Sequence, residues 1–567
     1  MRWAQTVKNN SQKALQPKKV SLPVRGDVRQ FSEAWKPPVK AELPEEVIMA
    51  STVLHPDHTR LIPKHLRMLT KMTGRTPLEH AAYTAPRRAW QQTILLTNTM
   101  LQFETADELY DRVHMLHHKH VMPNLDRVIE ADDALFAKMK LQVEEQMELR
   151  KQGKPTWGGV FRMNEALLRR RRDRGEKILT NESIFDQALQ TMTLHDIYRG
   201  KSGELIDGIL KPVLREGIIV EGCKLLPEHE SGNHVFLIHG APGTGKSVAW
   251  PRFKKELKDL GVPWPEVLKV NSDWYRPLLL EFGALSELHR PYYEHLTNDE
   301  LCSMTLVLFD KYINRVGEPN PHAVIEHPFA SEQMVHNTIR SNVAENPRDT
   351  KMKMVFFIVP PEVNVERIHH RAENGNPDSG LGTGRHVTVE TTLDRYKMAL
   401  EEFWIAVRMG WQGDNPFVFE IIDKNIPLAP GVVCPTIARG NFSSRTLEVL
   451  DVEGAMRMYY YGSIRSSATS LDNLYGTVRQ PKECLMGLLD LVDLMNTTRF
   501  IDPETQTVYA ELEGRKLTVV NAEMLEQKME NPYYAAAFNY LSKGKNISHT
   551  ERLQRERDTA EAQGKSV

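Results

Sequence analysis

The stretch that decides the fold is Val235-Phe-Leu-Ile-His239 followed by Gly240-Ala-Pro-Gly-Thr-Gly-Lys-Ser247. The first part is an apolar run typical of a buried strand, and the second has the spacing G-x-x-x-x-G-K-[ST] of a phosphate-binding loop. Glycines let the backbone adopt positive φ and turn N–H groups inward, where they and the N-terminus of the next helix hold an anion. The stretch therefore predicts a nucleotide-binding P-loop domain.

The loop residues have defined expected contacts. Lys246 reaches the β- and γ-phosphates, and the hydroxyl of Ser247 binds Mg²⁺. The predicted nucleotide-binding residues are Gly240, Ala241, Pro242, Gly243, Thr244, Gly245, Lys246, Ser247 and Val248. A chance glycine-rich turn is the alternative, and the flanking strand and helix patterns disfavour it. ATP and Mg²⁺ are the expected cofactors.

Four further short apolar segments follow the loop and alternate with helical stretches. They are Glu266–Val270, Ala323–Ile325, Met354–Val359 and Phe417–Ile422. This order predicts an α/β fold, with a P-loop kinase-like parallel sheet flanked by helices. Ligands of such sheets bind at the carboxyl ends of the strands, so the residues there are the candidates for chemistry.

Two carboxylates follow predicted strands. Asp273 lies just after the second strand, where it can take a proton from a substrate hydroxyl or hold the Mg²⁺ shell, although Asp is also a common helix cap. Glu326 ends the third strand and is expected to bind substrate or a metal-bound water. Arg276, one turn after Asp273, is assigned with Glu326 to substrate binding.

Arginines flank a glycine-rich loop after the fourth strand. Arg371 ends a predicted helix, Arg385 follows the loop, and Arg395 lies in the next helix. Such arginines are suited to a lid that stabilises the charge on a transferring phosphoryl group.

The motifs GAPGTGKS, VNSDWYRPLL, VIEH and RIHHR…GRHVTVETTLDRYKMALEEF, in this order, resemble the zeta-toxin-like kinases, which are P-loop phosphotransferases. The resemblance covers about residues 230–440. It implies that Lys246 and Ser247 bind ATP and Mg²⁺, that Asp273 is the general base, that Glu326 places the substrate and that Arg371 and Arg385 clamp the phosphates. The bacterial toxins phosphorylate a UDP-activated amino sugar.

Three features depart from the family pattern. His327-Pro328 follows the third-strand glutamate, the loop between Arg371 and Arg385 is long, and Arg385 stands where the family has a glycine. These changes affect the expected substrate more than the expected ATP binding.

The remaining chain is divided by composition. Residues 1–45 contain several prolines and are predicted to form an extended arm, and residues 46–229 a mostly helical region. The kinase domain is expected at 230–440. A small α+β appendage is expected at 441–542 and a charged, disordered tail at 543–567. The clearest helical pattern lies between Ala106 and Lys151, with Pro123 breaking it. A hairpin is expected within Thr507–Val520.

The N-terminal arm is basic. Residues 1–100 carry 16 Lys and Arg against 7 Asp and Glu, although the net charge of the chain is −1. This asymmetry predicts contact with RNA or a ribosome, a mitochondrial transit peptide, or a plain solvated tail. The localisation is accordingly predicted as mitochondrial, with cytoplasmic as the alternative. Four separated cysteines fit a reducing compartment, and no apolar run is long enough to span a membrane.

Two clusters in the helical region have alternative interpretations. His114, His117, His118 and His120 have helical spacing for metal ligands, but a solvated helix face is commoner. Arg169–Arg172 either neutralises RNA phosphates or forms a solvated or acid-paired face.

Two functions follow from the sequence. The first is a kinase that moves the γ-phosphoryl group of ATP to a hydroxyl of a small molecule or nucleotide. The alternative is a nucleotide-binding structural or assembly component of a ribonucleoprotein such as a mitochondrial ribosome, with the kinase fold as a docking module. The phosphoryl acceptor is not indicated.

Overall fold

The computed structural model describes residues 81–131, 201–217, 223–246, 249–279, 319–326, 349–374, 387–412, 417–424, 435–475 and 481–543, with isolated positions between 145 and 152 and between 301 and 339. Arg385, Ser247, Val248, the basic arm and Arg169–Arg172 lie outside the described residues. The expected contacts of these residues remain predictions.

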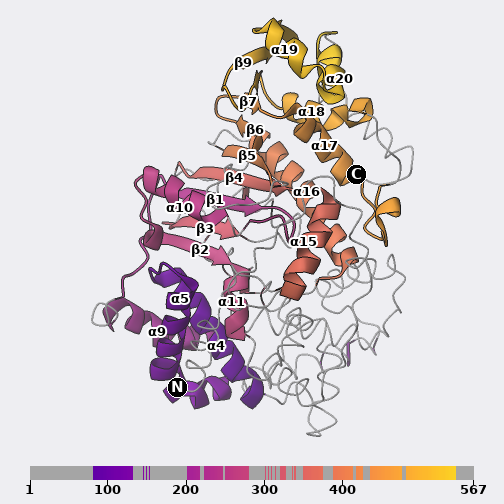
Figure 1. Ribbon diagram of the computed structural model, residues 1–567. Coiled ribbons are helices and arrows are strands. Elements are labelled where there is room, and N and C mark those ends of the chain that lie inside the picture. The colour runs from indigo at the N-terminus through magenta and orange to yellow at the C-terminus, as the bar shows by residue number, and fades with distance from the viewer. Residues whose placement is uncertain are drawn as a thin grey trace.

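Five parallel strands form the centre of the molecule (Figure 1). They are β1 (His234–His239), β2 (Val267–Asn271), β3 (His322–Glu326), β4 (Lys351–Ile358) and β5 (Phe417–Asp423). Their spatial order is β2-β3-β1-β4-β5, and each adjacent pair is parallel. The expected α/β class with a sheet flanked by helices is confirmed.

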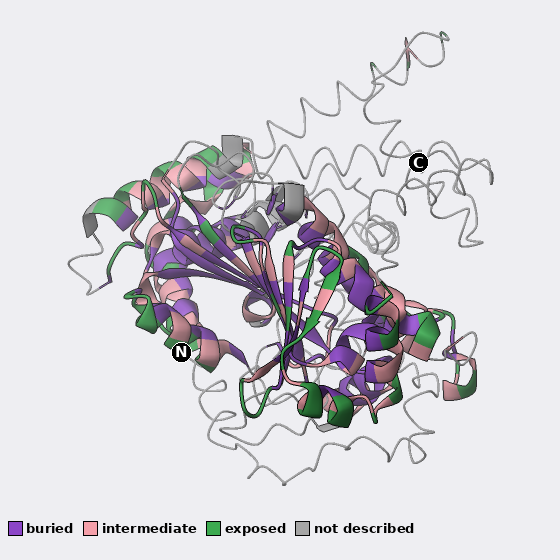
Figure 2. Cartoon of the chain, turned by 90° about the horizontal axis from the view of Figure 1, so that it is seen from above, coloured by how far each residue is buried: buried purple, intermediate pink, exposed green. Residues whose placement is uncertain are grey.

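Both faces of this sheet are buried, which explains why its strands are continuous apolar runs. Alternate residues of β1 point to opposite faces: Phe236 and Ile238 pack with α10 (Trp250–Asp259). Val235 and Leu237 lie in the core on the other face, which also contains residues of α16 (Val389–Gln412). Figure 2 shows the buried residues running through the sheet between the helices.

The N-terminal helices lie at the β2 edge of the sheet. They are α4 (Ala81–Met100), α5 (Ala106–Leu116) and α9 (Lys201–Pro212). One face of α4 and α5 packs on α9, and another face joins the core of the sheet. Pro123 lies in a 3-10 turn, Met122–Asn124, after α5 and a short π-helical segment, His117–Val121. The expected helical character of the N-terminal region is therefore confirmed in its described part.

The C-terminal strands continue the same sheet beyond β5. They are β6 (Thr436–Asn441), β7 (Thr446–Val449), β8 (Thr497–Ile501), β9 (Val508–Glu513) and β10 (Lys516–Val519). β6 pairs antiparallel with β5, so the five parallel strands and the C-terminal strands form one sheet, which has ten strands among the described residues. The expected hairpin is β9–β10, which turns at Gly514 with a φ of 55°.

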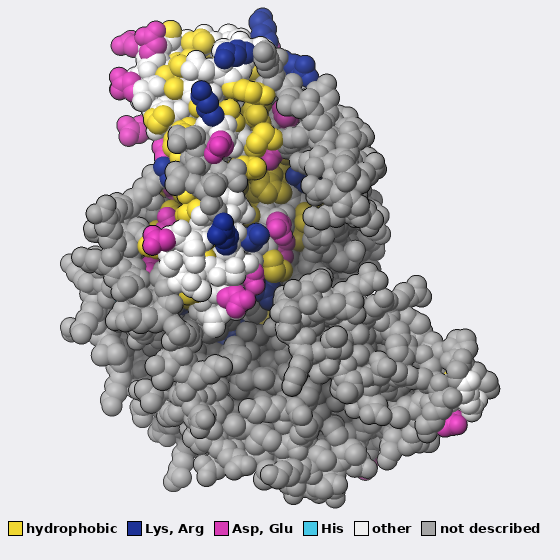
Figure 3. Space-filling model, turned by 90° about the vertical axis from the view of Figure 1, so that its right-hand side faces the viewer, with side chains coloured by type: hydrophobic (Ala, Val, Ile, Leu, Met, Phe, Trp, Pro, Cys, Tyr) yellow, Lys and Arg dark blue, Asp and Glu magenta, His cyan; other side chains and the backbone are white. Residues whose placement is uncertain are grey.

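Four helices cover this C-terminal half of the sheet. They are α17 (Val452–Gly462), α18 (Leu485–Val492), α19 (Ala522–Lys528) and α20 (Pro532–Leu541). On the face drawn in Figure 3, apolar side chains gather over this upper, C-terminal part of the molecule, with charged side chains between them. Within the part of the chain that the structure describes, none of the helices combines the length and apolarity that crossing a bilayer needs.

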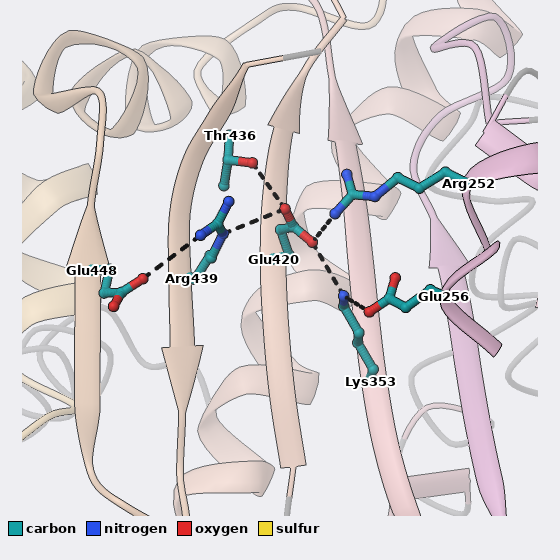
Figure 4. Close-up of polar contacts among 7 residues, drawn as sticks. All are labelled: Arg252, Glu256, Lys353, Glu420, Thr436, Arg439 and Glu448. Carbon is teal, nitrogen blue, oxygen red and sulfur yellow. Dashed lines mark hydrogen bonds and ion pairs between the residues drawn. The ribbon is translucent and has the colours of Figure 1, made fainter. Parts of the chain in front are cut away.

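The carboxylate of Glu420 joins the central strands to the C-terminal ones (Figure 4). It lies on β5, is nearly fully buried, and contacts Arg252 of α10 at 2.5 Å and Lys353 of β4 at 3.3 Å. Thr436 of β6 donates a hydrogen bond to it at 2.8 Å, and the guanidinium of Arg439 lies 3.6 Å away. Burial by itself raises the pKa of Glu420, but its contacts with Arg252 and Lys353 outweigh burial and lower it to about 2.

Candidate active site

The P-loop connects β1 to α10 with the backbone geometry that the glycines permit. Gly240, Gly243 and Gly245 have φ values of 144°, 83° and 85°, which other residues rarely adopt. A Cβ atom at Gly240 would lie only 2.6 Å from the carbonyl oxygen of Phe357 on β4. Glycine at this position is therefore required both by the backbone angle and by the neighbouring strand.

Lys246 is buried within the loop that it belongs to. Its Nζ donates hydrogen bonds to the carbonyl oxygens of Gly240 and Ala241, both at 2.8 Å. The hydroxyl of Thr244 also donates to Ala241, at 2.8 Å. The ammonium group thus lies on the loop itself, beside the backbone N–H groups that are expected to hold an anion.

Glu326 lies where three strand ends meet. Its backbone is in register with Ile238 of β1 and with Asn271 of β2. The carboxylate is buried, and Oε2 accepts hydrogen bonds from the indole Nε1 of Trp250 and from Nδ2 of Asn271, the second at 3.2 Å. Two neutral donors therefore hold this buried charge beside the P-loop helix.

Asp273 lies in the first turn of α11 (Ser272–Leu279), directly after β2. Its backbone N–H donates to Oδ1 of Asn271 at 2.9 Å, so Asn271, and not Asp273, caps the helix. The Asp273 carboxylate faces Arg276 at 3.5 Å, with side chains that are 43% and 6% exposed respectively. The acid is therefore accessible to solvent while its arginine partner is buried.

The N-terminal helices also reach α11. The indole of Trp90 on α4 donates to the carbonyl oxygen of Leu278 at 2.6 Å, and Phe103 lies 6.3 Å from the ring of Trp274. Burial chiefly, followed by the charges of Asp107 and Asp273, raises the pKa of the Tyr110 phenol. Helix α5 therefore comes close to the candidate base.

Helix α15 (Pro361–Asn374) carries Arg371 and packs on the P-loop. A Cβ atom at Gly243 would lie 2.6 Å from Cγ1 of Ile368, which shows how closely this helix approaches. Arg371 follows Ile368 by three residues, so both lie on one face of the helix. Arg395 lies in α16.

Histidines at the end of α5 and in the π-helical segment after it pack against a tryptophan. The rings of His114 and His117 each lie 4.8 Å from Trp90. Burial, with smaller contributions from His118 and His114, lowers the pKa of His117 to about 4. Among the residues that the structure describes, no three His, Cys, Asp or Glu side chains are placed to hold a metal ion.

The structure thus brings together Lys246, Glu326 and Asp273, all of them predicted from the sequence, at the carboxyl ends of neighbouring strands. The sequence did not reveal the linking roles of Asn271 and Trp250. Both are defined by contacts between strands or helices that are distant in sequence, so no local pattern indicates them.

Comparison with known proteins identifies the domain. Residues 221–408 match the family model described as Zeta toxin, so the chain contains a zeta-toxin domain, as its motifs predicted. Two solved structures are similar to the chain. AvrRxo1-ORF1:-ORF2, solved with ATP, has 12% identity and a TM-score of 0.31, covering 56% of this chain and 82% of its own. A structure of the PezAT chromosomal toxin–antitoxin system of Streptococcus pneumoniae has 15% identity and a TM-score of 0.24. The match covers 47% of this chain and 89% of the PezAT chain. No curated protein matches.

Proposed function

We propose that the zeta-toxin domain of this chain is an ATP-dependent phosphotransferase that moves the γ-phosphoryl group to a hydroxyl of a small molecule or nucleotide. The observation that supports this most is the arrangement at the ends of β1, β2 and β3. A glycine-rich loop with a buried lysine lies beside a buried glutamate, and Asn271 connects that glutamate to an accessible aspartate.

Each residue has a role in this proposal. The loop N–H groups and Lys246 bind the phosphates of ATP, and Arg371 and Arg385 neutralise the charge that spreads over the transferring group. Asp273 accepts the proton of the attacking hydroxyl, and Arg276 and Glu326 place the acceptor. Glu326 offers a buried carboxylate in register with the end of β1, and Ser247 is expected to supply a hydroxyl ligand, so these two residues would hold Mg²⁺. Bound Mg²⁺ would offset the phosphate charge.

The test is to measure ATP binding and then the transfer of a labelled γ-phosphoryl group by the full chain. UDP-sugars, nucleosides and RNA ends are offered as separate acceptors. We expect ATP binding and a labelled product with one acceptor class. A protein that binds ATP but labels none of these acceptors would limit the proposal to nucleotide binding, and a protein that binds no ATP would overturn it.

A further inference from the structure

Asn364 lies in the first turn of α15, against the P-loop. Its side chain is fully buried, and its backbone N–H donates to Pro360 at 3.0 Å. A Cβ atom at Gly243 would lie 2.8 Å from Oδ1 of Asn364. The carboxamide therefore sits directly beneath the turn of the loop, where only a glycine leaves it room.

A second feature of Asn364 is the hydrogen bonding of its carboxamide. Among the described residues, neither Oδ1 nor Nδ2 has a hydrogen-bond partner. A buried amide without partners destabilises the conformation that contains it, and most buried polar groups are bonded. Neighbouring Glu362 of the same helix, in contrast, accepts a hydrogen bond from Tyr475 at 2.7 Å. The unpaired group lies at the loop and is aimed at it.

A change in the loop conformation would supply the missing partner. Lys246 now bonds to the carbonyl oxygens of Gly240 and Ala241, and it must leave them to reach a phosphate. When the N–H of Gly243 turns toward a phosphate, the carbonyl of Pro242 points the opposite way, because the two groups are antiparallel in a trans peptide. A half-turn of the Asn364 carboxamide would then present Nδ2 to that oxygen.

We propose that Asn364 is a positioning residue of the P-loop, which donates a hydrogen bond to the Pro242 carbonyl when nucleotide phosphates are bound. The inference rests on the proposed function, because it assigns to Asn364 a contact made only with nucleotide in the loop. A group that gains a partner in one conformation shifts the equilibrium toward it, so Asn364 strengthens ATP binding without touching ATP.

The test uses the full chain with Asn364→Leu, which keeps the number and branching of side-chain heavy atoms but removes both polar atoms. We expect its ATP dissociation constant to rise about five- to tenfold, since one hydrogen bond is lost. The thermal midpoint without nucleotide should stay the same or rise, because an unpaired buried amide has been removed. A residue with a merely structural role would not change these two quantities in opposite directions.

The matched control is Ile368→Val, which alters packing on the same glycine without changing any hydrogen bond. It should lower the thermal midpoint and leave ATP affinity unchanged. Asn364→Ala decides the matter if the leucine variant does not fold. ATP affinity within twofold of the unchanged protein in a folded Asn364 variant overturns this inference alone. An unchanged protein that binds no ATP overturns the proposed function and the inference with it.

Discussion

Asn271 and Glu326 are joined by a 3.2 Å hydrogen bond from the side-chain amide to the buried carboxylate, at the point where β2 and β3 end in register. The oxygen of the same amide caps the helix that carries Asp273. One side chain therefore contacts both the Glu326 carboxylate and the backbone of Asp273.

Replacing Asn271 by Leu should consequently disturb both the Glu326 carboxylate and the start of the helix that carries Asp273. We expect a loss of about 1–3 kcal/mol in the free energy of unfolding, because Glu326 loses a donor while remaining buried. Phosphoryl transfer should fall more than ATP affinity. Asn271→Asp is the matched control, since Asp caps helices equally well but places a carboxylate beside Glu326. If both variants have the free energy of unfolding and the transfer rate of the unchanged protein, the bridging role of Asn271 is wrong.

Lys246→Ala should weaken the binding of ATP with Mg²⁺ by roughly ten- to a hundredfold, the usual range for losing a hydrogen bond from a charged donor. Isothermal calorimetry measures the affinity directly. Unchanged affinity would mean that the loop does not bind phosphate.

Asp273→Asn should leave ATP affinity unchanged and reduce transfer by about 10²–10⁴-fold, because the amide keeps the shape but cannot accept the proton. Stability should change little, since the Asp273 carboxylate is substantially exposed to solvent. The comparison of single-turnover rates with calorimetric affinities separates the two effects. Near-normal transfer would show that the base is another group.

Glu420 should make stability depend on pH under acid conditions. Its pKa in the folded chain is about 2, below the ordinary 4.5, so its ionisation stabilises the fold above about pH 4.5. That stabilisation, worth about 3 kcal/mol, is lost as the pH falls from 4.5 to 2. Glu420→Gln should be less stable at neutral pH and should show a flatter dependence in this range, measured by denaturant unfolding. Equal slopes for the two proteins would contradict the assignment.

His322 should also make stability depend on pH, but in a higher pH range than Glu420. Burial first, then the neighbouring His229 and His234, lowers its pKa to about 4. Because the unfolded chain binds a proton near pH 6.5 and the folded chain does not, stability falls as the pH drops from 6.5 to 4. The loss should be on the order of 3 kcal/mol. His322→Asn keeps an acceptor for the backbone N–H of His234, which now donates to Nδ1 at 3.0 Å, and should remove part of this slope. An unaltered slope would show that other groups cause it.

The sequence predicts the five parallel strands well, because strands buried on both faces are continuous apolar runs. The expected Val235–His239 and Phe417–Ile422 correspond to β1 and β5 within one residue at each end. The C-terminal strands are different. β6 has the sequence TIARGN, with polar and small residues that reflect its cross-strand partners, so nothing local indicates that it extends the sheet.

The positions in the fold of several candidate site residues were predictable to a similar degree. The phosphate-binding loop motif locates Lys246, and the ends of the second and third predicted strands locate Asp273 and Glu326. Asn364 and Trp250 could not be found in this way, because their importance depends on how α15 and α10 pack on the loop and the strand ends. The positions of Arg385 and Ser247 remain predictions.

The continuous sheet has a consequence for the segment that matches the zeta-toxin family model. The family match ends at residue 408, inside α16 and before β5. A fragment cut there would keep the P-loop, Asp273 and Glu326 but would lose the strand that covers the open edge of β4, together with the Glu420 carboxylate that neutralises Lys353. The segment that matches the zeta-toxin family model therefore ends before the strand that pairs with the outer edge of β4.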